Sequence, residues 1–549
     1  MLFFDRPSKT LNVFLQISVY RLFAMGNITI IILLLAIITA LAEVADRVKI
    51  PYPILLVLVG IGISLVPGLP VITLDPEVVF LLFLPPVLYS AAWTTSWPDF
   101  KASGRAISLL AIGCVLFTTT VVAVVAHYFI PGFGWPESFV LGAIISPPDA
   151  VAASAATKGL GIPRQITTIL EGESLVNDAT GLIAYKYGIA AAASGTFIFW
   201  LASINFFYVA VVGILVGLAL GQLFKWIHQI TPDNAINDTT LTFIAPYTAY
   251  LLAEQIHVSG VLSVVTCGLF LSWNSSSIFK HQSRLNAVSV WQTVIFILNG
   301  LIFILIGLQL PVILRHIQDH SFLTLLFYGT VISAATIILR IIWVYPGAYL
   351  PRWFSRTIRR REARPDPKLV TIVAWSGMRG VVSLAAALAL PITVGNVPFP
   401  NRDMIIFLTF SVIFATLVIQ GISLPSLIKW LGIKPSIQEQ QEEKEARLKM
   451  VTKVIEHIEE NYSLGLSDEV LNQVKTKYEI RIQRIRKGES AGKISEEQIG
   501  DFHRVQREII SVERSMLNTM RKEGQISEEA LRKIEYELDL EETRLILET

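Results

Sequence analysis

Acidic residues inside apolar stretches are the residues of this sequence best placed to do chemistry. Asp178 lies in the segment 171–179, and Ser174 precedes it by four residues. Residues four apart stack along one face of a helix, so the Ser174 hydroxyl and the Asp178 carboxylate can offer oxygen ligands to the same small cation. Hard cations prefer such oxygens. Desolvation disfavours the charged form of a buried carboxylate, which would let Asp178 exchange a proton for a cation near neutral pH.

A second carboxylate follows a pair of prolines. The run 146–150, Ser-Pro-Pro-Asp-Ala, lies within an apolar stretch and places Asp149 after Pro148. Each proline removes a backbone donor and clashes with the preceding turn, so the helix is expected to break there. Such a break is tolerated at membrane depth only where it is buried in protein or lines a cavity. Freed carbonyls and helix ends can then hold ions beside Asp149; the alternative is a structural kink with a surface carboxylate.

Two arginines also lie inside apolar stretches. Arg340 is embedded in the stretch 337–343, and Arg379 lies between two glycines in the run 377–380. A buried arginine needs a carboxylate or carbonyl partner. The glycines beside Arg379 indicate a second interrupted helix. Glu173 fits a carboxylate held in a structural ion pair better than it fits an ion ligand.

The composition indicates that most of this chain faces a membrane. Of its 549 residues, 53% are hydrophobic and 16% are charged, whereas soluble globular chains carry about 25% charged residues. A net charge of +2 lacks the basic excess that a nucleic-acid partner requires. A membrane span needs roughly 17 to 25 mostly apolar residues. The sequence therefore predicts about thirteen membrane-spanning helices, near residues 27–46, 52–67, 76–94, 106–130, 138–158, 167–193, 197–224, 240–256, 259–273, 290–313, 322–350, 369–392 and 403–430.

Basic residues in the loops predict the orientation of these spans. Alternate loops hold Lys or Arg, and the intervening loops hold almost none apart from Arg315 and Arg402. Because cytoplasmic loops are enriched in basic residues, the alternation predicts an odd number of spans, an outer N-terminus and a cytoplasmic C-terminus in the plasma (inner) membrane. The basic loop residues are Arg47, Lys49, Lys101, Arg105, Lys158, Arg164, Lys225, Lys280, Arg284, Arg352, Arg356, Arg359, Arg360 and Arg361.

Changes in composition predict three regions. Residues 1–26 form an N-terminal segment with three basic residues, which is either signal-like or a stretch before a true start at Met25. Residues 27–432 form the membrane domain. Residues 433–549 are charged with apolar residues at helical spacing, and are expected to form a helical cytoplasmic tail. That tail is regulatory, a dimer contact or a solvated appendage.

Two other classes of membrane protein compete with a carrier. A passive channel would need a continuous polar path, whereas the ionisable residues of these spans cluster on a few helices. An intramembrane enzyme would need a recognisable nucleophile or metal motif, but neither His-Glu-x-x-His nor Gly-x-Ser-x-Gly occurs. Cys114 and Cys267 lie far apart in apolar runs and are interpreted as small buried residues. We therefore expect a transporter rather than an enzyme, without a cofactor.

Five segments resemble those of the monovalent cation/proton antiporters of the sodium/proton exchanger type, in their bacterial form, and occur in that family's order. The run Glu-Ser-Leu-Val-Asn-Asp at 173–178 is the most specific of them. The segment 250–260 is also similar, and the resemblance covers about residues 27–432. The other four segments are Leu-Pro-Pro at 84–86, Ser-Pro-Pro-Asp at 146–149, Gly-Met-Arg-Gly at 377–380 and the run 412–421.

The resemblance implies an all-α polytopic membrane protein with thirteen helices. Two broken helices would cross at the midplane between inverted repeats, which the positions of the fifth and twelfth spans also fit. It further implies a homodimer in a lipid bilayer, and an elevator-like movement of a six-helix core against a dimerisation domain. The activity would be exchange of Na⁺ (or Li⁺) for H⁺.

Site residues are implied by the same resemblance. It places the cation and the proton on Asp178, with Ser174 and Asp149 as nearby Na⁺ ligands and Asn177 supporting the site. An Asn at 177, in place of a second Asp, is typical of electroneutral members and implies one cation per proton.

Two structural roles also come from the resemblance. Glu173 would pair with Arg340 and hold helices together, and Arg379 would face the carbonyl ends of the crossing helices.

The sequence departs from the family's pattern at two places. Pro148 and Ala150 replace a hydroxyl residue and a proline beside Asp149, and Ser90 stands where an acidic residue is frequent. These departures leave the selectivity open, and exchange of K⁺ or of several monovalent cations for H⁺ is the alternative.

Overall fold

The computed structural model describes most of the chain. The described residues are 27–48, 51–66, 76–157, 160–194, 199–231, 234–315, 317, 321–361, 364–394, 397–433, 437–462, 478, 482, 496–523, 534 and 537–542. The expected N-terminal segment 1–26 and much of the expected tail lie outside them. The chain divides into two compact units, Met1–Pro435 and Ser436–Thr549.

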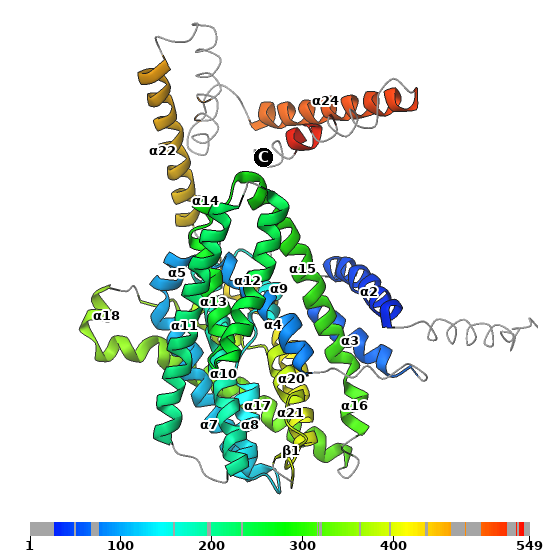
Figure 1. Ribbon diagram of the computed structural model, residues 1–549, viewed down its shortest axis with the longest axis vertical. Coiled ribbons are helices and arrows are strands. Elements are labelled where there is room, and N and C mark those ends of the chain that lie inside the picture. Colours follow the sequence, from blue (N-terminus) through cyan, green and yellow to red (C-terminus); the bar gives the residue numbers. More distant parts are fainter. Residues whose placement is uncertain are drawn as a thin grey trace, which may run out of the picture. The chain divides into compact units, whose positions relative to one another are not determined.

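Helices make up nearly all of the described residues in the first unit, which confirms the expected all-helical class (Figure 1). One short antiparallel pair, β1 (Thr393–Val394) and β2 (Val397–Pro398), interrupts them. The helices are α2 (Asn27–Val48), α3 (Tyr52–Ser64), α4 (Pro76–Thr94), α5 (Trp97–Ala102), α6 (Gly104–Ser108), the π-helix η1 (Leu109–Cys114), α7 (Val115–Phe129), α8 (Trp135–Ile145), α9 (Ala150–Thr157), α10 (Arg164–Ser194), α11 (Phe199–Ile230), α12 (Ala235–Gln255), α13 (Gly260–Trp273), α14 (Ser275–Ile278), α15 (His281–Leu308), α16 (Leu310–Arg315), α17 (Phe322–Phe354), α18 (Arg356–Arg361), α19 (Pro367–Trp375), α20 (Val381–Leu388) and α21 (Arg402–Leu431).

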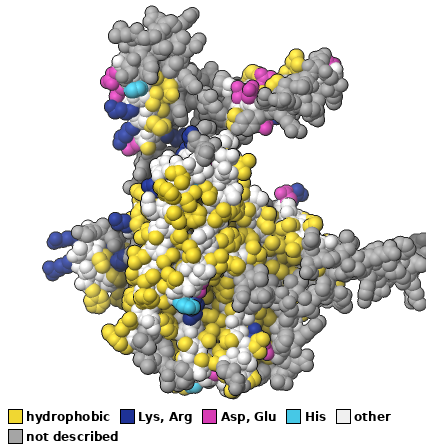
Figure 2. Space-filling model, in the orientation of Figure 1, with side chains coloured by type: hydrophobic (Ala, Val, Ile, Leu, Met, Phe, Trp, Pro, Cys, Tyr) yellow, Lys and Arg dark blue, Asp and Glu magenta, His cyan; other side chains and the backbone are white. Residues whose placement is uncertain are grey.

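Several of these helices suit a hydrocarbon environment. Within the described residues, six are long and apolar enough to cross a membrane, and four more are shorter apolar helices. The number of thirteen spans stays a prediction. Figure 2 shows a broad hydrophobic surface over α11, where Phe207, Val211 and Leu215 are each more than half exposed. Side chains of this kind are expected to face lipid.

Some helix bounds differ from the predicted spans. The expected span 290–313 begins instead at His281, because polar residues form the first turns of α15, where Gln282 donates a hydrogen bond to Asn286 (3.3 Å). It ends at Leu308, and Pro311 lies in the first turn of a separate helix, α16, a position where a missing N–H does no harm. Apolar length alone therefore misplaces both ends.

Most of the helices pack as two groups. The first group consists of α2, α3, α4, α11, α12, α13 and α15, in which α3 packs on α15 and α13 packs on both α4 and α11. The second group consists of α7, α8, α9, α10, α17, α19, α20 and α21, in which α8 packs on α7 and α10, and α17 packs on α21. The groups meet where α20 contacts α4 and α15, where α10 contacts α4, α11 and α13, and where α3 contacts α9 and α21.

Glycines bring the helices within each group close together. A Cβ atom at Gly60 would overlap the carbonyl oxygen of Ile304, and one at Gly307 would overlap that of Val57, so α3 and α15 touch backbone to backbone. Small residues at such crossings are the usual means of packing helices in membranes. The contact also fixes which residues of α3 and α15 face one another.

The second unit contains two described helices, α22 (Ile437–Tyr462) and α24 (Glu496–Lys522). Leu517 of α24 is buried with Leu538, and Arg514 donates hydrogen bonds to Asp539 (2.5 Å) and Glu542 (2.8 Å). Leu538, in the region expected to form the helical tail, therefore packs on α24.

Candidate functional site

The fifth predicted span is broken at its two prolines. Helix α8 ends at Ile145, and α9 begins at Ala150. Asp149 is the last residue before α9, and its Oδ1 accepts a hydrogen bond from the backbone N–H of Val151 (2.8 Å), as an N-cap residue does. The break thus places a carboxylate at the start of a helix, where the helix dipole favours negative charge.

The twelfth predicted span is broken in the same way at its glycines. Helix α19 ends at Trp375, and α20 begins at Val381. The backbone N–H of Asp149 donates to the carbonyl oxygen of Met378 (2.7 Å), and Gly380 lies against the Asp149 carboxylate. The two breaks are therefore in direct contact.

Arg379 lies between the carbonyl groups that these breaks leave free. Its side chain is buried, and its Nε donates to the carbonyl oxygen of Ile145 (2.6 Å), while Nη1 donates to that of Gly377. Its backbone N–H donates to Oγ1 of Thr416 in α21 (3.1 Å). A cation at the carbonyl ends of helices is favourable, so Arg379 has the position expected for stabilising the crossing.

Helix α10 carries three of the predicted site residues to these breaks. Oγ of Ser174 accepts a hydrogen bond from the N–H of Ala150 (3.3 Å), and Nδ2 of Asn177 donates to the carbonyl oxygen of Pro148 (2.8 Å). Asp178 is largely buried, and among the described residues its carboxylate has no hydrogen-bond partner. Asn177 thus holds the break, while Asp178 keeps its oxygens free.

Glu173 and Arg340 form a buried ion pair. Nη1 of Arg340 lies 2.6 Å from Oε1 of Glu173, and Nη2 lies 2.8 Å from Oε2, with each side chain about 1% exposed. Nε and Nη2 of Arg340 also donate to the carbonyl oxygen of Val373 (3.2 and 3.0 Å). Two parallel bonds are the strong form of this pair, and they tie α10 to α17 and α19.

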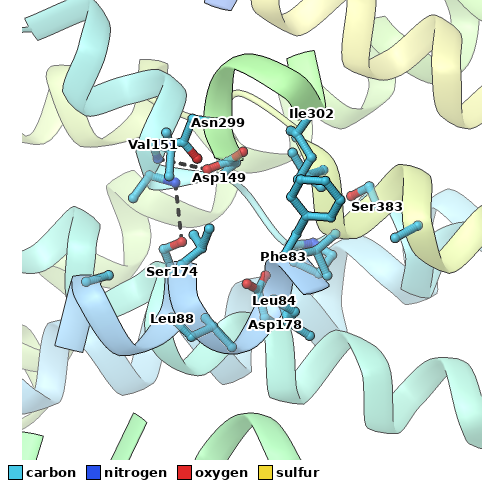
Figure 3. Close-up of a pocket in the computed structure, with 18 of the residues that line it drawn as sticks. Phe83, Leu84, Leu88, Asp149, Val151, Ser174, Asp178, Asn299, Ile302 and Ser383 are labelled. Carbon is cyan, nitrogen blue, oxygen red and sulfur yellow. Dashed lines mark hydrogen bonds between the residues drawn. The ribbon is translucent and has the colours of Figure 1, made fainter. Parts of the chain in front are cut away.

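Asp149, Ser174 and Asp178 line one cavity of about 70 Å³ (Figure 3). That volume accommodates more than one water-sized particle. One wall comes from the second helix group and carries all of the cavity's carboxylates and hydroxyls; the other comes from α4 and α15 of the first group. Asn177, Glu173, Arg340 and Arg379 are not among the lining residues, and they surround the site rather than face the cavity.

Sequence reasoning missed three polar residues of this cavity. Glu171 lines it from α10, one turn before Ser174, Asn299 lines it from α15, and Ser383 lines it from α20. Glu171 is the first residue of the segment 171–179 that carries Asp178. Asn299 is a lone amide within the apolar stretch 294–306. A polar side chain in a membrane span costs free energy and usually has a function, which is the signal by which the sequence identifies Asn299 as a candidate.

The arrangement can bind a small cation and a proton in competition. Three carboxylates (Asp149, Glu171 and Asp178) and two hydroxyls (Ser174 and Ser383) line the cavity, and oxygens are the ligands that hard cations prefer. Among the described residues there is no group of three or more His, Cys, Asp or Glu side chains that could hold a metal ion.

Known proteins resemble this chain in sequence and fold. A family model described as "Sodium/hydrogen exchanger, transmembrane" matches residues 30–430. The uncharacterized Na⁺/H⁺ exchanger YjcE of Escherichia coli (strain K12) is 31% identical over 546 residues, which cover 94% of this chain and 98% of that protein. A sodium, potassium, lithium and rubidium/H⁺ antiporter of Bacillus pumilus (strain SAFR-032) is 34% identical over 413 residues, or 73% of this chain and 61% of that protein. The solved structure of the sodium proton antiporter MjNhaP1 from Methanocaldococcus jannaschii at pH 8 is similar in fold, with a TM-score of 0.58 at 20% identity, over 74% of this chain and 99% of that one.

Proposed function

The chain belongs to the sodium/hydrogen exchanger family, and we propose that it exchanges Na⁺ (or Li⁺) for H⁺ across a membrane with Asp178 as the shared binding site. The observation that carries this proposal is the cavity at the two helix breaks. Asp178 and Asp149 line the same cavity, and the Asp178 carboxylate has no hydrogen-bond partner among the described residues.

Exchange follows from competition at this cavity. A cation that enters is coordinated by Asp178, Asp149 and the Ser174 hydroxyl, and displaces the proton that Asp178 holds in its absence. Asp149 is oriented by the N–H of Val151 and by the start of α9. When the cation leaves, desolvation favours renewed protonation. Because neither the empty charged site nor the doubly occupied site is favourable, cation and proton move in opposite directions.

Access alternates by movement of the second helix group against the first. The carboxylates and hydroxyls of the cavity belong to the second group, and the opposite wall is almost wholly apolar, so this wall offers little hindrance to sliding. The Glu173–Arg340 pair and Arg379 lie within the second group and keep the two breaks together as it moves. In this proposal thirteen spans form two inverted halves, and the first group forms the contact of a homodimer.

The exchange is proposed to be electroneutral and to take place in the plasma (inner) membrane. Asn177 is neutral and engaged with the carbonyl of Pro148, so it adds no charge beside Asp178. One cation then replaces one proton. The C-terminal unit lies on the cytoplasmic side, as the basic loops predict.

A second candidate is exchange of several monovalent cations, K⁺ included, for H⁺. The observation that favours it is the relative from Bacillus pumilus, whose name includes potassium and rubidium and which is 34% identical over 413 residues. In both cases Asp178 has the same role.

The test is transport by the purified full-length chain in proteoliposomes that contain a pH-sensitive dye. A pH difference is imposed, and NaCl, LiCl, KCl or choline chloride is then added. The rate at which the pH difference dissipates is recorded with and without valinomycin and K⁺, which clamp the voltage. We expect dissipation with Na⁺ and Li⁺ that the voltage clamp does not change.

Dissipation by K⁺ as fast as by Na⁺ would establish the broad-cation candidate. A rate that depends on the clamp would contradict electroneutral exchange. No dissipation with any of the cations would contradict antiport itself.

A further inference from the structure

The two walls of the cavity differ in polarity, and the apolar wall contains one polar residue. Ten lining residues come from α4 and α15, and nine of them are apolar; the exception is Asn299. Figure 3 shows Asn299 and Asp149 at the same end of the cavity. The first helix group therefore presents a single polar side chain to the site.

Asn299 lies deep within a helix that is otherwise suited to hydrocarbon. It is about 6% exposed, and Leu298, Leu301 and Ile302 surround it in the sequence. A buried amide without a partner is destabilising, so a side chain of this kind is expected to have one. Its polar neighbour is Tyr52 in the first turn of α3, whose hydroxyl lies within reach of the Asn299 amide.

The packing of α3 on α15 fixes this pair. The two helices touch backbone to backbone at Gly60 and Gly307, and further along the same contact the ring of Tyr52 lies 6.3 Å from that of Phe296. Asn299 is one turn beyond Phe296, so Tyr52 reaches its amide. A hydrogen bond from Tyr52 would hold the amide in place at the cavity.

We propose that Asn299, positioned by Tyr52, is a ligand of the transported cation that the first helix group contributes opposite Asp149 and Asp178. An amide oxygen is a neutral ligand for a hard monovalent cation. It therefore adds a ligand atom without changing the net charge of the site, and one cation still replaces one proton. The proposal rests on the proposed function. It adds that affinity and selectivity depend on a residue of the opposite wall.

The amide has a second use when the cation is absent. Its N–H groups can donate to a carboxylate, and Asp149 is the carboxylate at the same end of the cavity. One side chain thus serves both occupied and empty states, which an apolar residue at this position would not do.

The experiment compares Asn299→Leu, Asn299→Gln and Tyr52→Phe with the wild-type chain in proteoliposomes. We expect Asn299→Leu to raise the KM for Na⁺ about tenfold, as loss of one charge-assisted contact would, with a smaller fall in the maximal rate. Asn299→Gln should restore part of the affinity because it retains the amide. Tyr52→Phe should give an intermediate KM, and the ratio of Na⁺ to Li⁺ affinity should change in Asn299→Leu.

Asn286→Leu is the matched control. Asn286 is on the same helix, thirteen residues or about 20 Å away along the axis, and its side chain bonds to Gln282. We expect a wild-type KM from it. A wild-type KM and cation ratio in Asn299→Leu would overturn the proposal even if wild-type exchange is as proposed.

Cation binding provides a readout that does not depend on transport. Na⁺ should raise the unfolding temperature of the purified wild-type protein at constant ionic strength held with choline, because a ligand of the folded state stabilises it. This shift should be smaller in Asn299→Leu and unchanged in Asn286→Leu. Equal Na⁺-dependent shifts in wild type and Asn299→Leu would overturn the assignment, and would do so whether or not the protein exchanges Na⁺ for H⁺.

A third substitution at residue 299 separates coordination from packing. Asn299→Asp adds a carboxylate of nearly the same shape, and its negative charge favours protonation of Asp149 and Asp178. We expect half-maximal exchange to move to a more alkaline pH. A pH profile identical to that of the wild type would contradict a place for residue 299 in the site.

Discussion

The carboxylate of Asp149 lies against Gly380, so closely that a Cβ atom at residue 380 would overlap Oδ2 of Asp149. The two residues belong to different broken helices and are more than two hundred positions apart in the sequence. Their contact, together with the bond from the N–H of Asp149 to the carbonyl of Met378, makes the two breaks one structural unit. The position of Asp149, a proposed cation ligand, therefore depends on the absence of a side chain at residue 380.

Gly380→Ala is expected to lower exchange by at least tenfold. The added methyl group would displace the Asp149 carboxylate, and a misplacement of about 1 Å in a site can reduce a rate a hundredfold. The measurement is the initial rate of Na⁺-driven pH change in proteoliposomes. Gly62→Ala is the control, because a Cβ atom there meets nothing within 4 Å. Wild-type kinetics in Gly380→Ala would show that Asp149 need not stay where the structure has it.

Asp178→Asn is expected to abolish exchange while leaving the fold intact. Asparagine has nearly the same shape but neither binds a proton near neutral pH nor carries charge for a cation. Thermal unfolding in detergent should stay near that of the wild type, since replacing a buried carboxylate by a neutral group removes a desolvation penalty. Asp403→Asn, in the first turn of α21, is the control and should transport normally. Retained exchange in Asp178→Asn would remove the central assumption of the proposed mechanism.

The sequence predicted local features of the fold better than long-range ones. Apolar runs predicted where helices lie, because burial in hydrocarbon requires continuous apolar length. The paired prolines at 147 and 148 predicted the first break, since each removes a backbone donor. Helix ends were less predictable, as α15 shows, because polar residues such as Gln282 can continue a helix beyond its apolar part.

The site was less predictable than the fold, for a physical reason. Spacing along α10 placed Ser174 and Asp178 on one face, but it contained no information on the opposite wall. Asn299 lines the cavity from α15, more than a hundred residues further along the chain than Asp178. Likewise, the carbonyl of Ile145, which accepts from Arg379, is more than two hundred residues away in the sequence. Contacts of this kind depend on the whole assembly of helices.

Arg340→Ala is expected to lower the free energy of unfolding by about 3 to 5 kcal/mol, the usual cost of leaving one charge of a buried pair without its partner. Glu173 would remain buried, and the carbonyl of Val373 would lose its donor. The measurement is equilibrium or thermal unfolding in detergent. The double variant Arg340→Ala with Glu173→Gln should be more stable than Arg340→Ala alone, because the unpaired charge is removed.

The control for the buried Glu173–Arg340 pair is an exposed ion pair. Arg47 bonds to Glu43 at 3.0 Å with both side chains more than two-thirds exposed, so Arg47→Ala should change stability by no more than about 1 kcal/mol. Equal stabilities of Arg340→Ala and Arg47→Ala would contradict a structural role for the buried pair.

Asn177→Asp is expected to destabilise the protein by about 1 to 3 kcal/mol or more, because the nitrogen of Asn177 is the atom that holds the first break. Nδ2 donates to the carbonyl oxygen of Pro148 (2.8 Å) in a fully buried position. An ionised Asp has no donor, so that carbonyl would lose its partner and a negative charge would be buried beside it. Asn286→Asp is the matched control, since the oxygen of Asn286 accepts its bond from Gln282 and Asp keeps an oxygen there. Unfolding in detergent at neutral pH should therefore separate the two variants. If Asn177→Asp unfolds at the same temperature as Asn286→Asp, the bond to Pro148 does not stabilise the break, and Asn177 must act in the site in some other way.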